Sequence, residues 1–133
     1  GCERVLHARD VSTGTRDVER RLEGDLAIPL GPGLLAVPVP GHTAGSCALL
    51  VDDTFLFTGD HLWGDAAGRL GMSRAVCWWD WDAQLASLAA LAALRFEWVL
   101  PGHGRPWRAA GPDAAAEAVR ALARELTARS GRG

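Results

Sequence analysis

Three short segments of the chain end an apolar run at a glycine and place a possible metal ligand beside it. "AVPVPGHTAGSC" does so at His42, "FLFTGD" at Asp60 and "WVLPGHG" at His103. A strand fixes the direction of a residue at its end, and glycine allows a sharp turn and a close approach of the backbone. Imidazole and carboxylate groups together suit zinc or non-haem iron. The pattern therefore predicts one site built from these three residues.

The apolar runs that must position this site read as short strands. "GPG" and the pair Asp52-Asp53 are typical of tight turns between strands. Pro29 lacks a backbone donor, so its strand is expected at an edge of the sheet. A further short strand is expected within "RVLHARDV" near the N-terminus, and residues 12–24 and 61–76 are expected to be loops. The main predicted strands are 25–30, 34–39, 46–51, 54–58 and 96–100.

Two segments have the apolar spacing of helices. The first is expected to begin near Asp80 or Asp82, either of which can cap it. The second is expected at 113–129, with Asp113 as its cap. Their predicted buried residues are Leu85, Leu88, Leu91 and Ala92 in the first helix and Val119, Leu122 and Leu126 in the second. Strands and helices in this order predict an α/β fold with both helices on one face of a mixed or antiparallel sheet.

Composition excludes several classes of function. A chain of 133 residues is one domain at most, because domains commonly have roughly 100–200 residues. Its net charge of −2 gives no basic surface of the kind that binds nucleic acid. No apolar run is long enough to span a membrane. Cys2, Cys47 and Cys77 form no Cys-x-x-Cys pair. Reduced thiols and a cytoplasmic location are therefore expected.

The motifs around the three candidate ligands resemble those of the metallo-β-lactamase superfamily, especially its glyoxalase II-like hydrolases. "PGHTAGS" matches the Pro-Gly-His-Thr-x-Gly-Ser signature, and "LFTGDHL" and "LPGHGRPW" are similar to the later ligand motifs. The resemblance covers about residues 5–110. It implies an αββα sandwich, of which residues 1–133 would be one partial domain, the second half.

The resemblance also implies a role for each residue. His42 would bind the first zinc ion, His103 the second, and Asp60 would be the bridging and catalytic carboxylate. Thr43 and Ser46 would orient His42 and its loop. The family reaction is hydrolysis of a thioester, ester or amide in a small-molecule substrate by metal-bound hydroxide.

One family signature, His-x-His-x-Asp-His, is absent from the sequence, whose only histidines are His7, His42, His61 and His103. The chain is therefore expected to be inactive alone and to need the missing N-terminal half, or to self-associate. His61 is next to Asp60 and is expected to support the site from the loop, because neighbours on an extended segment point apart. His7 is expected at the surface without a role. Two alternatives are a non-catalytic remnant acting as an interaction module and an iron-dependent, flavodiiron-like redox protein.

The tryptophans of "CWWDW" and Trp63 suggest a substrate wall, but aromatic residues before a helix more often anchor it to the sheet. We therefore expect them, with Trp98 and Trp107, to serve packing.

Overall fold

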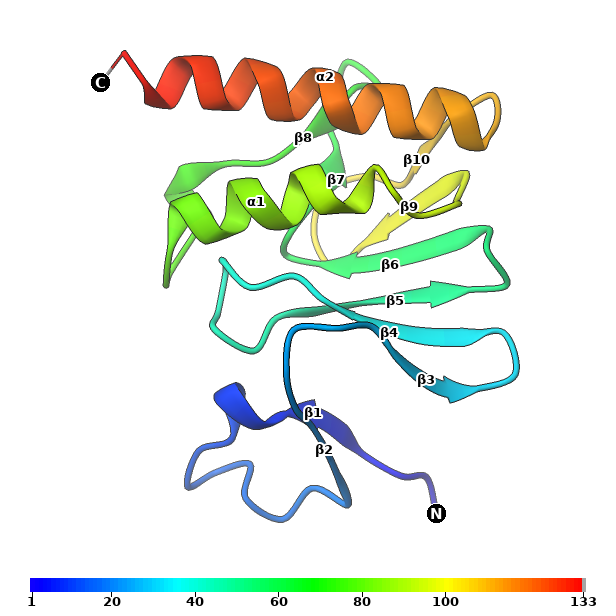
Figure 1. Ribbon diagram of the computed structural model, residues 1–133, viewed down its shortest axis with the longest axis vertical. Coiled ribbons are helices and arrows are strands. Elements are labelled where there is room, and N and C mark those ends of the chain that lie inside the picture. The colour runs from blue at the N-terminus through cyan, green and yellow to red at the C-terminus, as the bar shows by residue number, and fades with distance from the viewer. Residues whose placement is uncertain (133) are drawn as a thin grey trace.

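A six-stranded mixed sheet forms the centre of the computed structural model, which describes residues 1–132 (Figure 1). Its strand order is β10-β9-β6-β5-β4-β3. Neighbouring strands are antiparallel except for β6 and β9, which are parallel. The strands are β3 (Ile28–Gly31), β4 (Leu34–Pro38), β5 (Cys47–Val51), β6 (Phe55–Gly59), β9 (Trp98–Pro101) and β10 (Trp107–Arg108).

The turns and edges of this sheet follow from local sequence. Asp52 and Asp53 adopt φ angles of 52° and 47°, the left-handed conformation that a tight hairpin turn requires. Pro29 lies in β3, which is an outer strand, so the missing N–H breaks no interior ladder. The short β10 was not predicted. It pairs Trp107 with Val99 at the other edge of the sheet.

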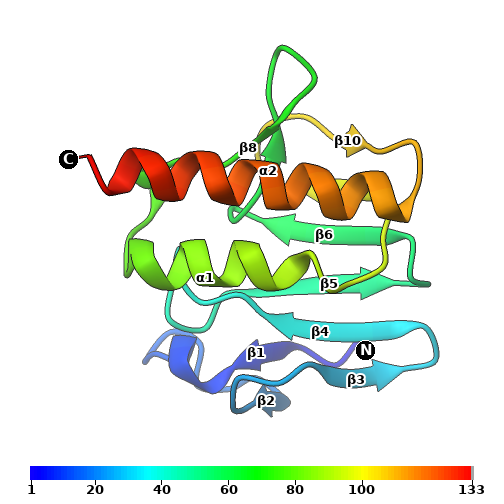
Figure 2. The same ribbon diagram turned by 45° about the horizontal axis from the view of Figure 1, so that its top comes forward.

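Both helices cover one face of the sheet, as predicted, and lie side by side across it (Figure 2). Helix α1 (Trp81–Leu91) begins where the Asp80 carboxylate accepts a hydrogen bond from the backbone N–H of Ala83. Helix α2 (Pro112–Ser130) has Gly111 at its cap position and no side-chain cap. The prediction that Asp113 caps it is wrong, because Pro112 already occupies the first helical position and Asp113 lies within the first turn.

Cross-strand pairs on the helix side form the core together with the helices. Leu50 pairs with Leu35 on one side and Leu56 on the other, and Leu56 pairs with Val99. The fully buried side chains packed with this row include Leu88, Leu91, Phe96 and Val119. Of the residues predicted to be buried, Leu88, Leu91 and Val119 are buried. The others pack against this core half-buried, and one of them, Ala92, lies at the C-cap of α1; they are Leu85, Ala92, Leu122 and Leu126.

Two segments predicted as loops contain short strands. Within 12–24, β2 (Arg20–Leu22) pairs in parallel with β1 (Val5–His7), and Leu22 is buried. Within 61–76, β7 (Trp63–Gly64) pairs with β8 (Leu70–Gly71), followed by the short 3-10 helix η2 (Arg74–Val76). Strands of two or three residues show no apolar alternation, so periodicity could not identify them.

The sheet face opposite the helices is apolar and only partly covered. Its side chains alternate with the core row, and among them Leu34, Phe55 and Phe57 are exposed, Phe57 to 44%. The N-terminal segment with β1 and β2 lies on the other side of the sheet from the helices (Figure 1). There it buries Ala36 but leaves Phe55 and Phe57 open.

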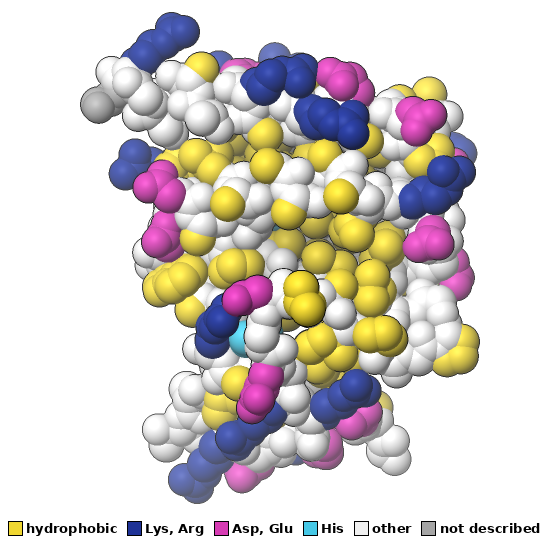
Figure 3. Space-filling view, viewed as in Figure 1, with side chains coloured by type: hydrophobic (Ala, Val, Ile, Leu, Met, Phe, Trp, Pro, Cys, Tyr) yellow, Lys and Arg dark blue, Asp and Glu magenta, His cyan; other side chains and the backbone are white. Residues whose placement is uncertain are grey.

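Side chains of one kind also gather on the surface seen in Figure 3. Apolar side chains occupy the middle of that surface, and charged ones lie over α2, along the rim and on the N-terminal segment.

No helix within residues 1–132 combines the length and the apolar character needed to cross a bilayer.

Candidate metal centre

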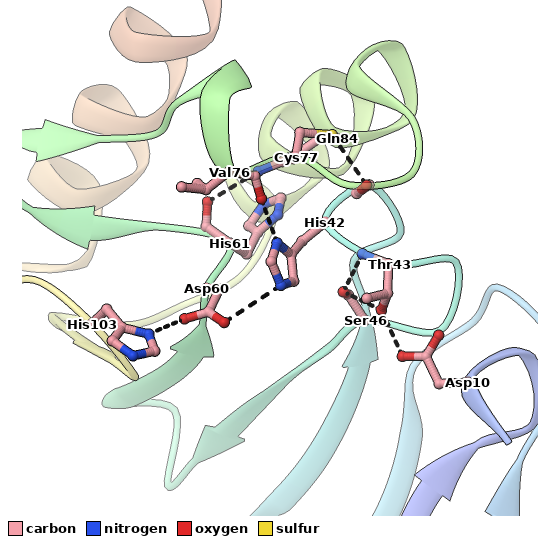
Figure 4. Close-up of polar contacts among 11 residues, drawn as sticks. Asp10, His42, Thr43, Ser46, Asp60, His61, Val76, Cys77, Gln84 and His103 are labelled. Atoms are coloured by element: carbon pink, nitrogen blue, oxygen red, sulfur yellow. Dashed lines mark hydrogen bonds and ion pairs between the residues drawn. The ribbon is translucent and has the colours of Figure 1, made fainter. Parts of the chain in front are cut away.

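The carboxylate of Asp60 lies between the imidazoles of His42 and His103 (Figure 4). Its Oδ2 is 3.4 Å from His42 Nε2, and its Oδ1 is 2.5 Å from His103 Nδ1. The structure thus brings the three predicted ligands together, although 18 to 61 positions separate them in the chain.

Strand direction explains this convergence. Strands β4, β6 and β9 run in the same sense, since β5 is antiparallel to both β4 and β6 and β9 is parallel to β6. Their carboxyl ends therefore lie at one edge of the sheet, and each candidate ligand follows one of these ends. A hydrogen bond from the Gly102 N–H to the Gly59 carbonyl, 2.8 Å long, joins the last two loops directly.

A hydrogen bond to the backbone selects the tautomer of His42. Its Nδ1 lies 2.6 Å from the carbonyl oxygen of Val76, which can only accept, so Nδ1 carries the proton. In the neutral imidazole, Nε2 is then the nitrogen with the free lone pair, and it faces Asp60. This is the arrangement that a metal-binding histidine requires.

The loop that carries His42 is held by the segment leading into α1. Backbone N–H groups of Trp78 and Asp80 donate to the carbonyls of His42 and Gly41, at 3.2 and 3.1 Å. The Ser87 hydroxyl donates to the Pro40 carbonyl at 2.7 Å. Three consecutive carbonyls of the loop are therefore fixed from α1 and the residues before it.

Gly41 is required by this contact. Its φ is 152°, and a Cβ placed there would overlap Cα and Cβ of Gln84 and lie 2.8 Å from its Cγ. Helix α1 thus packs its backbone directly against the residue that precedes His42, and only glycine leaves room.

Thr43 and Ser46 lie on the other side of the loop and are tied to Asp10. The Thr43 hydroxyl donates to Asp10 Oδ2 at 2.5 Å, and the Gly45 N–H donates to Asp10 Oδ1 at 2.8 Å. The Ser46 hydroxyl oxygen accepts from the Thr43 N–H at 2.9 Å. Sequence reasoning missed Asp10, because a lone aspartate after a short strand carries no distinguishing signal.

His61 is fully buried and lies on the α1 side of Asp60 (Figure 4). Neither of its ring nitrogens has a hydrogen-bond partner among the described residues. Burial, with a smaller contribution from His42, lowers the pKa of His61 to about 4. It is therefore a neutral imidazole behind the ligands. The Gln84 side-chain amide donates to the backbone carbonyl of His61 at 3.5 Å and not to its ring.

Two predictions about other residues are wrong. His7 is buried rather than at the surface, because Nε2 donates to the Gly24 carbonyl at 2.9 Å and Nδ1 accepts from the Arg9 N–H at 3.2 Å. Trp78 and Trp79 do not anchor α1, since they are 76% and 55% exposed. Trp81 does serve packing, through its core contacts and an indole hydrogen bond of 2.9 Å to the Ser130 hydroxyl.

Trp98 and Trp107 lie at the sheet, whereas Trp78 lies at the site. Trp107 packs on the core, and the Arg108 guanidinium lies 5.1 Å from the ring centre of Trp98. The Trp78 ring instead lies against the His42 ring, with centroids 4.5 Å apart.

The donor set fits half of a two-metal site. Two tetrahedral ligands about 2.1 Å from one zinc ion are about 3.4 Å apart, which is the spacing of His42 Nε2 and Asp60 Oδ2. His103 hydrogen-bonds Asp60 directly, and its side chain is 87% exposed, with room to reorient. Among residues 1–132, no group of three or more His, Cys, Asp or Glu side chains has the arrangement of a metal cage. If Asp60 were shared between two metals, each metal would have two protein donors from these residues.

Comparisons with known proteins agree with the motifs. A family model described as the metallo-beta-lactamase superfamily matches residues 5–103. A hydroxyacylglutathione hydrolase from Shewanella sp. (strain ANA-3) is 36% identical over 88 residues, covering 65% of this chain and 30% of that protein. The chain therefore spans less than a third of the curated relative that it matches.

Solved structures are similar in fold. An archaeal metallo-beta-lactamase superfamily protein from Sulfolobus tokodaii has a TM-score of 0.55 at 24% identity, over 80% of this chain and 39% of that one. A metallo-beta-lactamase family protein from Thermus thermophilus has a TM-score of 0.52 at 24% identity, over 85% of this chain and 35% of that one. At this identity the likeness shows the fold alone, and it confirms the predicted fold class.

We predict that Gly41→Ala lowers the free energy of unfolding by about 2–4 kcal/mol, because a methyl group would overlap Gln84 and the backbone would be strained. Gly68→Ala is the matched control, since Gly68 also has a positive φ but nothing lies within 4 Å of its added Cβ. It should lose only about 1–2 kcal/mol. Urea denaturation measures both, and equal losses would contradict the clash.

We predict that His61→Leu changes the free energy of unfolding by less than about 1 kcal/mol, because it removes two unpaired buried nitrogens while nearly filling their space. His61→Ala should lose about 2 kcal/mol or more through the cavity left behind. A large loss in both variants, measured by thermal melting, would mean that the ring nitrogens do have partners.

Proposed function

Because the chain belongs to the metallo-beta-lactamase superfamily, we propose that it supplies half of the active site of a zinc-dependent hydrolase. The observation behind this proposal is the Asp60 carboxylate, which meets a different imidazole with each of its two oxygens. That is the arrangement expected of a carboxylate shared by two metal ions, with His42 on the first and His103 on the second.

The family and the curated relative support a carbonyl substrate. Hydroxyacylglutathione hydrolase cleaves a thioester by its name, and a carbonyl compound of this kind, an ester or an amide suits the same chemistry. When bound, two zinc ions would lower the pKa of a shared water to about 7 and stabilise the oxyanion formed at the carbonyl.

The chain's own residues prepare this site before any metal binds. The Val76 carbonyl accepts the Nδ1 proton of His42, which leaves Nε2 as the nitrogen that faces Asp60. On the far side of the loop, the Thr43 hydroxyl donates a hydrogen bond of 2.5 Å to Asp10 Oδ2. This bond limits movement of the loop that carries His42. Asp60 is fixed at the end of β6, and its two oxygens point to opposite sides.

The other ligands have to come from outside residues 1–132, because only two protein donors per metal are present and catalytic zinc usually has three. We infer that the chain is a partial domain that works with a half carrying His-x-His-x-Asp-His, in the same native chain or another. The uncovered sheet face supports this, since Phe55 and Phe57 would pack against a second sheet about 10 Å away.

A second candidate function rests on the same face. An exposed apolar surface on a sheet that retains its fold would also serve a non-catalytic interaction module. The two candidates differ in metal binding, which the module does not need. Imidazole and carboxylate donors also suit iron, so metal analysis of the purified chain separates the zinc hydrolase from an iron redox protein.

We predict that the isolated chain binds zinc weakly, with a dissociation constant of about 1 μM or higher. Zinc sites with binding free energies of ~10–16 kcal/mol have four protein ligands, and this chain offers fewer. His103→Ala should weaken this binding further, whereas Arg105→Ala, in the same loop, should not. Calorimetry measures both. Tight binding that depends on His103 would mean that other residues complete the site, and absence of binding would favour the interaction module.

We predict that the chain self-associates at micromolar concentration through the uncovered face, because exposed apolar patches above a few hundred Å² drive association. Phe57→Ser should reduce the association. Leu26→Ser is the control, since Leu26 is 82% exposed but precedes β3. Sedimentation velocity compares the three chains, and a wild-type monomer with a cooperative melt would count against an exposed interface.

A further inference from the structure

A pocket of about 340 Å³ opens beside the candidate ligands. His42, Asp60 and His103 form one part of its lining. The rest is contributed by Trp63, Val76, Trp78 and Gly104. Its size is within the roughly 300–1,000 Å³ of small-molecule sites, and it shares three residues with the proposed metal centre.

Trp78 lies at this pocket with most of its indole ring exposed to solvent, which is unfavourable for a large apolar side chain. Leaving a large aromatic side chain 76% exposed forgoes the apolar burial that it would gain in the core. Nevertheless, the hydrogen bond from its N–H to the His42 carbonyl fixes its backbone, and its ring lies against the His42 ring at an interplanar angle of 39°. An exposed ring in a fixed position is suited to contact a ligand.

Trp63 forms a second, independent part of the wall. A Cβ at residue 104 would lie 2.8 Å from Trp63 Cβ, so Gly104 is what allows this tryptophan to approach the loop of His103. The indole N–H of Trp63 lies near Gly71, in the partner strand of β7. Both aromatic walls are therefore fixed by backbone contacts to the ligand loops.

Charge limits what this pocket can hold. None of the 14 arginines is among the residues that line it, and Asp60 is its only acidic residue. A phosphate or carboxylate placed against the tryptophans would find no side-chain cation there, and metal ions held by His42, Asp60 and His103 would attract it only toward the other part of the pocket. A neutral apolar group would gain burial against two indoles and Val76 at no electrostatic cost.

We propose that Trp63 and Trp78 form a subsite for a neutral, aromatic or apolar group that adjoins the scissile carbonyl of the substrate. This inference rests on the proposed function for the identity of the reaction, and it narrows the substrate to esters, thioesters or amides with an uncharged, flat acyl or leaving group. Trp78 contacts the substrate and does not take part in bond breaking.

The test is binding of methyl 2-naphthoate, a neutral aromatic ester, to the metal-free full chain, followed by NMR of the tryptophan indole N–H signals. The signals of Trp63 and Trp78 should shift and that of Trp79 should not. Trp78→Ala should weaken binding at least tenfold, and Trp78→Phe, which keeps a flat ring, should restore most of it. Trp79→Ala is the matched control, since Trp79 is exposed beside Trp78 but does not line the pocket.

The outcomes separate this proposal from the hydrolase proposal. Naphthoate binding lost in Trp78→Ala, without zinc binding, would support the subsite while removing the hydrolase. Zinc binding without naphthoate binding would overturn the subsite alone. Equal weakening by Trp79→Ala, or equally tight binding of the doubly anionic 1,5-naphthalenedisulfonate, would also overturn it. Thermal melting of each variant excludes loss of fold as the cause, and the fold should survive because Trp78 and Trp79 are both exposed.

Discussion

The geometry of the site depends on the contact between the loop at Pro40–His42 and the segment that leads into α1. Each carbonyl of this loop accepts a hydrogen bond from that segment or from α1 itself, and the imidazole of His42 donates one back to Val76. The contact requires glycine at position 41, because the backbone of α1 passes too close for any side chain. Helix α1 thus covers the core and also orients a candidate ligand.

Much of this arrangement could be predicted from the sequence. Glycine beside histidine or aspartate at the end of an apolar run marked His42, Asp60 and His103, and the sheet brings them together because their strands run in one direction. The helices were recognisable from their spacing, and capping chemistry narrowed the start of α1 to Asp80 or Asp82, of which the structure uses Asp80. These features depend on residues near each other in the chain, which pattern reasoning detects well.

The features that were missed depend on residues far apart in the chain. Asp10 reaches Thr43 across 33 positions, and no local pattern reveals such a pair. The exposure of Trp78 was misjudged because an aromatic run before a helix usually packs inward, whereas here the backbone bond to His42 holds the ring at the pocket. The burial of His7 was missed because its hydrogen-bond partner, the Gly24 carbonyl, is distant in the chain. The strands within 61–76 were missed because two residues are too few to show an apolar alternation.

The parallel pairing of β6 with β9 also determines when the site can form during folding. The β4–β5–β6 hairpins close locally, so His42 and Asp60 can approach each other early. His103 arrives only after the segment between β6 and β9, which includes α1, has crossed over and docked, and such long-range parallel pairing is slow. A metal ion that needs both histidines would therefore bind only after this step, and its binding would stabilise the slowly formed pairing of β6 with β9.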